Sequence, residues 1–411
     1  MQLENIKFGY LGDYIKGIIK AYQGKVEYNN KLITGYKKRL VENIVKKKFY
    51  GSNIDHNTKN HKNFADIIRT LFKNVEIEKY YTEKGLRKII CNEVAKRIVE
   101  TKKIELDNKD KSLIVDNIKK NIISLREQIY AFQVLHLRYT GEDIRISSCK
   151  LVTFDEKVKA LKTPFYDFIP KPNIKYRNFI IVNIFGNDST KDHKRAWELA
   201  RNFIALLKLQ FTKSPLVELS DSYLKPYKKN WAIGYKRNGV LHWDLEIDDK
   251  KKLECVKLFR NHLDNIFENN LHESLSLSLQ RFSNAQKIPN SAYKLAEIIG
   301  CIETLLTTRE DAKKTDVNMT TRLYNRIISF RGDVFNKEVL KRLLEEYYEK
   351  RSEYTHQSTI GELEKEIINI IRIYQIIVEI YSKEMCKYKS KKELIQKLDK
   401  IIKKNKKNNK N

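Results

Sequence analysis

The stretch YYEKRSEYTH, from Tyr347 to His356, decides how the C-terminal part of the chain is interpreted. Upstream of it, Leu340 and Leu344 recur at the spacing of one face of an amphipathic helix, and the same face continued forward reaches Arg351. A cation therefore stands where the pattern calls for a buried or interfacial side chain. Arg351 and His356 are five positions apart, which places them about 140° apart around a helix. We expect either that the helix ends between them or that a second copy of the chain completes their site.

The composition indicates a globular protein with a large positive charge. The chain has 411 residues, of which 41% are hydrophobic and 10% aromatic, so it is long enough and apolar enough to form more than one core. Its 81 Lys and Arg residues against 52 Asp and Glu residues give a formal charge of +29. Such a surplus is typical of proteins that bind a polyanion, with nucleic acid as the first partner to consider and an anionic membrane as the second. The alternative source of the charge is a coding sequence biased toward lysine, asparagine and isoleucine codons.

Cysteine usage and apolar runs disfavour several classes of protein. The 5 cysteines are scattered, odd in number and without a C-x-x-C pair, which favours neither a disulfide framework nor a zinc site. Charged residues interrupt the region 1–22 before a signal-peptide core develops, and no apolar run reaches the roughly 18 residues of a membrane span. We therefore expect a cytoplasmic protein that uses no metal ion and no cofactor.

Residues 1–140 are predicted to form an N-terminal helical region. Apolar residues recur there at three- and four-residue spacing, from Phe64 to Phe72 and again from Leu113 to Leu137. The amphipathic pattern, rather than any motif, is the basis for this expectation.

Residues 141–250 are predicted to form a small α+β module, a possible sensor or RNA-binding part. Its elements are expected at 144–146, 150–154 and 179–185 as strands and at 196–209 as a helix. The Asn238-Gly239 pair between two apolar runs predicts a hairpin turn. The turn after residue 185 has one glycine and no G-K-[ST] sequence, so an ordinary strand-to-helix connection is expected rather than a phosphate loop.

Residues 251–386 are predicted to form a helical bundle and residues 387–411 a basic tail. The expected helices are 253–282, 291–306, 319–330, 337–355 and 362–382. A capping box from Thr359 to Glu362 opens the last helix and places His356 in the short connection before it. The tail is expected to be a solvated helix that frays into disorder and contacts phosphates. The fold class predicted for the whole chain is mainly α.

The spacing R-x-x-x-x-H carries little information by itself, because it occurs twice in the sequence. The copy formed by Arg237 and His242 spans the Asn-Gly turn and is set aside for that reason. The copy formed by Arg351 and His356 is the candidate that the helical context supports.

Residues 253–385 resemble the HEPN domains, which are helical bundles with an R-x(4–6)-H motif at the end of a late helix. The closer resemblance is to the Apea-like HEPN group associated with bacterial abortive infection. The segment from Ile302 to Leu306 is similar to the E-x-L-L segment of that group, and the segment from Tyr348 to His356 is similar to its Y-x-x-R-S-x-x-x-H core. Members of the group commonly have glycine after the histidine, where this chain has Gln357.

The resemblance implies a metal-independent endoribonuclease that works as a homodimer in antiphage defence, with RNA as its substrate. It implies that His356 acts as the general acid or base and that Arg351 stabilises the phosphate in the transition state. Glu303 is a plausible companion for Arg351, and Tyr348 and Ser352 are supporting members of the motif. A phage-derived molecule or a protein is a possible trigger, recognised by the N-terminal or middle part of the chain.

Other interpretations remain open. The guanidinium of Arg351 could snorkel to solvent or form a structural pair with Glu303, and His356 could be a capping residue. The chain could then be a non-catalytic RNA-binding or dimerising HEPN scaffold, or a regulatory protein with an inert bundle. A metal-dependent nuclease is less well supported, since no compact cluster of Asp and Glu stands out.

Overall fold

A computed structural model describes the fold over most of the chain after residue 74. The described residues are 75–101, 107–139, 144–146, 148–154, 177–211, 217–227, 230–233, 245–247, 270–311, 318–331, 336–356, 363–385 and 387–408. Over these residues the protein is mostly helical with a small antiparallel sheet, which confirms the mainly α fold class. The chain divides into two compact units, Met1–Gln128 with Ile184–Arg195, and Ile129–Asn183 with Ala196–Asn411.

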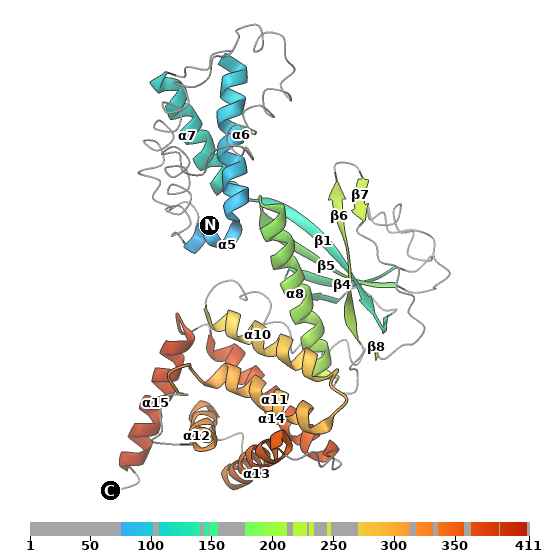
Figure 1. The fold of residues 1–411 in the computed structure, drawn as a ribbon, viewed down its shortest axis with the longest axis vertical. Coiled ribbons are helices and arrows are strands. Elements are labelled where there is room, and N and C mark those ends of the chain that lie inside the picture. Colours follow the sequence, from blue (N-terminus) through green and yellow to red (C-terminus); the bar gives the residue numbers. More distant parts are fainter. Residues whose placement is uncertain are drawn as a thin grey trace. The chain divides into compact units, whose positions relative to one another are not determined.

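Where the structure describes the N-terminal segment of the first unit, it contains α5 (Val75–Tyr80), α6 (Glu83–Thr101) and α7 (Asn108–Ile123). α6 and α7 lie side by side, and the hydroxyl of Tyr81 donates a 2.9 Å hydrogen bond to the carbonyl oxygen of Ile122 (Figure 1). Helix formation here agrees with the N-terminal prediction, whereas the predicted helical stretch at 64–72 lies outside the described residues.

One carboxylate in this unit accepts hydrogen bonds from backbone N–H groups at the starts of two helices. Asp188 precedes α8 (Ser189–Gln210), and its Oδ1 accepts a 3.0 Å hydrogen bond from the backbone N–H of Thr190. Its Oδ2 accepts a 2.7 Å hydrogen bond from the backbone N–H of Thr82, just before α6. A Cβ at Gly85 would lie 1.9 Å from that Oδ2, so only glycine allows this approach. The turn after β5 (Arg177–Gly186) is thus a capped strand-to-helix connection.

The sheet of the second unit contains a strand that the sequence pattern assigned to a helix. Its strand order is β3-β4-β5-β1-β6-β7. The strands are β1 (Arg126–Leu135), β3 (Ile144–Ile146), β4 (Cys149–Phe154), β5 (Arg177–Gly186), β6 (Glu218–Tyr227) and β7 (Asn230–Ile233). In this sheet β3 pairs with β4, β4 with β5, β1 with β6 and β6 with β7, each pair being antiparallel. α8 lies along one face, where Trp197 meets Phe132 edge to face at 5.3 Å (Figure 1).

The prediction that the helical region extends to residue 137 is therefore wrong. Helix α7 ends at Ile123, and β1 follows with consecutive buried residues, Tyr130 to Phe132. A strand covered on both faces loses its alternation, so its apolar residues can imitate helical spacing. His136 has a positive φ of 59° and separates β1 from β2 (Leu137–Tyr139). β2 pairs in parallel with β8 (Leu245–Ile247).

Between residues 270 and 408, the described part of the second unit is helical (Figure 1). The helices there are α10 (Asn270–Ala285), α11 (Ser291–Leu306), α12 (Met319–Arg331), α13 (Lys337–His356), α14 (Glu364–Met385) and α15 (Lys391–Asn408). α11 packs against α10, α13 and α14. The helical expectation is confirmed for these ranges, while the Asn238-Gly239 turn and residues 253–269 lie outside the described part.

The last helix differs from the solvated, fraying segment that was expected over 387–411. Three apolar side chains of α15 are buried: Leu394, Ile395 and Leu398 are 1%, 4% and 3% exposed. α15 packs against α12, and Asp399 forms an ion pair with Arg326 of that helix. The lysine-rich composition concealed an apolar face with helical spacing, and that face is what folds the helix onto the bundle.

Candidate functional site

Three residues of the predicted site, Arg351, Ser352 and His356, belong to α13. Arg351 and Ser352 lie in its last two turns, and His356 is its final residue. The side chains of these residues are outside the described part of the chain, as is the capping-box segment 359–362. The expectation that His356 lies in the connection after the helix is thus corrected, because the helix continues through it.

The continuous helix removes one of the two ways in which Arg351 and His356 could share a site. A break between them would have allowed the chain to fold the two residues together. Five positions along an unbroken helix correspond to a rise of roughly 7.5 Å and a rotation of about 140°. The second way, completion by another copy of the chain, does not depend on a break in this helix.

The other two predicted residues are brought together by the packing of α11 on α13. The hydroxyl of Tyr348 donates a 2.6 Å hydrogen bond to Oε1 of Glu303. Both side chains are half-buried, and the neighbouring Tyr347 is fully buried, which raises its pKa to about 12. The expected pairing of Glu303 with Arg351 lies outside the described side chains, and the contact that is described joins Glu303 to Tyr348, one turn earlier in α13.

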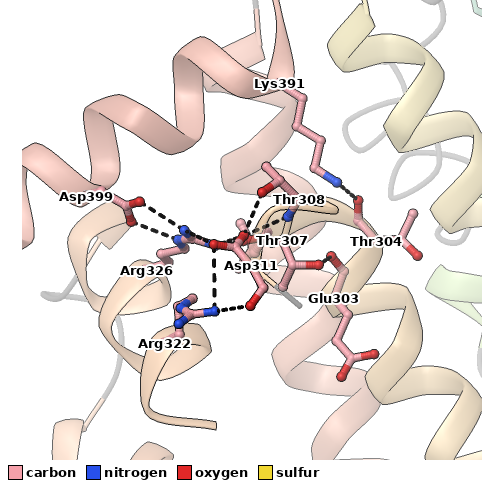
Figure 2. Close-up of polar contacts among 10 residues, drawn as sticks. Glu303, Thr304, Thr307, Thr308, Asp311, Arg322, Arg326, Lys391 and Asp399 are labelled. Carbon is pink, nitrogen blue, oxygen red and sulfur yellow. Dashed lines mark hydrogen bonds and ion pairs between the residues drawn. The ribbon is translucent and has the colours of Figure 1, made fainter. Parts of the chain in front are cut away.

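Cations hold the C-terminal end of α11, where Glu303 lies. The ammonium group of Lys391 in α15 donates a 2.5 Å hydrogen bond to the carbonyl oxygen of Thr304. Arg326 of α12 donates a 2.8 Å hydrogen bond to the carbonyl oxygen of Leu306. Figure 2 shows the contact between Lys391 and Thr304. Positive groups are favourable here because the last carbonyl groups of a helix carry partial negative charge.

Arg326 is also the centre of a buried ion network (Figure 2). Its Nη1 and Nη2 donate to the two carboxylate oxygens of Asp311 at 2.7 and 3.0 Å. Its Nε and Nη2 donate to Asp399 at 2.9 and 3.0 Å. The side chains of Arg326 and Asp311 are each 1% exposed, and that of Asp399 is 35% exposed. Arg322 adds a 2.6 Å hydrogen bond to the carbonyl oxygen of Asp311.

Two pKa values are displaced in this network. Burial tends to raise the pKa of Asp311, but hydrogen bonds from Arg326 and from the backbone of Thr308 outweigh it and hold that pKa far below its usual value. Burial lowers the pKa of Lys391 to about 8, with Asp311 opposing that shift and Arg326 adding to it. The network therefore favours the charged form of Asp311, whereas burial disfavours the charged form of Lys391.

The sequence reasoning did not single out Arg326 and Asp311, although a signal for Arg326 was present. Arg326 stands beside the buried residues Leu323 and Ile327 on the apolar stripe of α12. That is the same criterion, a charge on an apolar stripe, that singled out Arg351. At Arg326 the outcome is a satisfied structural ion pair, so the criterion detects an unusual environment and does not by itself identify catalysis.

The described residues contain neither a cluster of metal ligands nor a helix that could span a membrane. No group of three or more His, Cys, Asp and Glu side chains is placed there to hold a metal ion. Within the same residues, no helix has both the length and the apolar character needed to cross a membrane. Comparisons of the chain with protein-family models, with curated proteins and with solved structures found no match.

Proposed function

We propose that the chain is a metal-independent endoribonuclease whose site is formed by Arg351 and His356 at a homodimer interface. The observation that carries the proposal is the 2.6 Å hydrogen bond between Tyr348 and Glu303. It joins the E-x-L-L segment of α11 to the Y-x-x-R-S-x-x-x-H segment of α13, the two segments on which the HEPN resemblance rests. A shared structural link between two separate motif segments is more specific than the Arg-His spacing alone.

The residue types suit cleavage of RNA without a metal ion. A base removes the proton from the 2′-hydroxyl, the 2′-oxygen attacks the phosphorus, and the bond to the 5′-oxygen breaks as that oxygen takes up a proton. His356 supplies or accepts a proton near neutral pH. It is the final residue of α13, and we assign it the acid role in this proposal. Arg351 stabilises the charge on the phosphate oxygens. The products carry a 2′,3′-cyclic phosphate and a 5′-hydroxyl.

The unbroken helix supports the proposal of a dimer. Because Arg351 and His356 lie about 140° apart on α13, one phosphate is reached more readily by residues from two chains than by both from one. The formal charge of +29 favours RNA as the substrate. The resemblance places this activity in antiphage defence by abortive infection, with a phage-derived molecule or a protein as the trigger.

The test is incubation of total RNA in EDTA with the wild type and with Arg351→Ala and His356→Ala, followed by identification of the new RNA ends. We expect cyclic-phosphate ends from the wild type and a loss of at least about a hundredfold in each variant. Arg342→Ala is the matched control, because Arg342 lies on α13 and its side chain is 70% exposed in an ion pair with Glu346. Undiminished cleavage by either site variant would contradict the proposal.

A second candidate is a non-catalytic RNA-binding scaffold. It is favoured by a row of exposed lysines on α15, namely Lys392, Lys397, Lys400, Lys403 and Lys404. These side chains offer phosphate contacts on the face opposite the buried one. Salt-sensitive RNA binding by the wild type without any cyclic-phosphate product would support the scaffold over the nuclease. Substituting Lys397 and Lys400 with Gln should then reduce the salt dependence of binding.

A further inference from the structure

A groove in the second unit is separate from the α11–α13 contact. It has a volume of about 370 Å³ and lies among α8, β1, β6 and α10. Leu135 of β1 and Ile204 of α8 are buried and contribute apolar surface to it. The volume is at the lower end of the roughly 300–1,000 Å³ that small-molecule sites occupy, so one small ligand fits and an extended polymer does not.

Polar contacts fix the walls of the groove. Asn202 of α8 donates a 2.9 Å hydrogen bond to the hydroxyl of Ser276 in α10, and Gln280 donates a 3.1 Å hydrogen bond to the same hydroxyl. Two residues after the end of α10, Lys287 forms an ion pair with Glu218 of β6. The helix is thereby tied both to α8 and to the sheet, so the groove exists without a ligand.

The lining combines an aromatic ring, a cation and neutral hydrogen-bonding groups. Trp197 and Arg201 are four residues apart and lie on the same face of α8. Gln280, Ser283 and Asn284 of α10 line the groove as well. Within the part of the chain that the structure describes, no carboxylate or hydrogen-bond acceptor is assigned to the guanidinium of Arg201.

The charge pattern favours an anionic ligand. The lining contains one carboxylate, that of Glu218, and its ion pair with Lys287 offsets its charge. Arg201 is therefore the cation that remains for a ligand, and its planar fork of donors matches phosphate oxygens. Trp197 and the apolar residues suit a flat ring, because nucleobases stack on aromatic side chains. The amide groups of Gln280 and Asn284 add hydrogen-bonding partners for ring edges.

We propose that this groove binds a single free nucleotide, with its phosphate at Arg201 and its base beside Trp197. The ligand class is a nucleoside monophosphate, which has one flat ring system and one compact anion, the two groups that Trp197 and Arg201 suit. This site requires neither Arg351 nor His356 and stands independently of the proposed nuclease activity.

The experiment is calorimetric titration of the full-length protein with AMP and CMP, and with adenosine and inorganic phosphate as incomplete probes. We expect nucleotide binding that is at least about tenfold tighter than adenosine binding, since one charge-assisted phosphate contact is worth roughly that factor. Arg201→Gln should remove the difference between AMP and adenosine. Arg372→Gln is the control, because Arg372 is exposed on α14 and does not line the groove.

A second variant, Ser283→Tyr, fills the groove and should abolish binding of both AMP and adenosine. It keeps the test decisive if Arg201→Gln proves unstable, and thermal unfolding of each variant checks the fold. Absence of nucleotide binding overturns the proposal, as does an AMP-to-adenosine ratio that survives Arg201→Gln. Binding of oligoribonucleotides alone would likewise overturn it and would assign the groove to an RNA-binding surface.

Discussion

Arg326 uses every donor of its guanidinium group. Its five N–H groups reach both oxygens of Asp311, both oxygens of Asp399 and the carbonyl oxygen of Leu306. Removing one partner of a buried ion pair lowers the stability of the fold strongly, because the other partner is left as a buried charge without its compensating contact. The network therefore fixes the positions of α12 and α15 at the end of α11.

The two carboxylates should contribute unequally to stability. Asp311→Asn should lower the free energy of unfolding by about 3 kcal/mol, because its side chain is 1% exposed. Asp399→Asn should cost about 1 kcal/mol or less, because its side chain is 35% exposed and water screens the pair. Urea unfolding of both variants measures the difference. The double variant Asp311→Leu/Arg326→Met should be more stable than Asp311→Asn, and equal losses in the two single variants would contradict this account.

Lys391 should make the stability of the folded protein depend on pH in the alkaline range. Its pKa is about 8 in the folded protein against 10.5 for an ordinary lysine, so between these values the unfolded chain holds more protons. Stability from this group therefore rises as the pH increases from about 8 to 10. Urea midpoints across that range should show the rise in the wild type and in Lys392→Met, an exposed neighbour, but not in Lys391→Met. Parallel curves for all three proteins would refute the assignment.

The limits of residue-level prediction are visible in Tyr348, Glu303 and Arg326. The motif comparison named Tyr348 and Glu303 separately, but a hydrogen bond between residues 45 positions apart depends on how α11 and α13 pack. Arg326 carried a detectable signal as a charge on an apolar stripe, yet its partners Asp311 and Asp399 come from a turn and from another helix. Sequence periodicity describes one helix at a time and contains no information about partners between helices.

At the scale of elements, the helices with a single apolar face were the most predictable. α11 begins at Ser291 and ends at Leu306 as expected, because Asn290 accepts a 3.0 Å hydrogen bond from the N–H of Tyr293 and one face is continuously buried. β1 was not predictable in this way. Its neighbours in the sheet, β5 and β6, lie far from it along the chain. α15 was misjudged because its many lysines outweighed three buried apolar residues.

Helix α15 should consequently be needed for a stable bundle. Deleting residues 391–411 removes Leu394, Ile395 and Leu398 from the core and leaves Arg326 without Asp399. We expect the free energy of unfolding to fall by about 3 kcal/mol or more. Deletion of residues 406–411 alone is the control and should change it little. Thermal and urea unfolding of both truncations provide the measurement, and an unchanged long truncation would show that the tail is dispensable.

At the scale of the molecule, the net charge and the unbroken α13 both favour the proposed dimeric nuclease. In the proposed nuclease, the formal charge of +29 promotes encounter with RNA but selects no particular bond in it. The proposed chemistry needs fixed groups on opposite sides of a phosphate, and Arg351 and His356 are about 140° apart around α13. A two-fold dimer solves this problem if the arginine of one chain and the histidine of the other meet at each site.

This arrangement predicts complementation between two inactive proteins. Arg351→Ala and His356→Ala should each lack RNA cleavage, but mixing them under conditions of subunit exchange should restore activity. In a mixed dimer one site receives both substitutions and the other receives none; with random exchange half of the dimers are mixed, so about a quarter of the wild-type sites return. Cyclic-phosphate ends formed in EDTA measure the recovery, with each variant alone and the Arg351→Ala/His356→Ala double variant as controls. If exchange is verified and no activity returns, the arginine and histidine of each site come from the same chain, and the site shared between two chains is refuted.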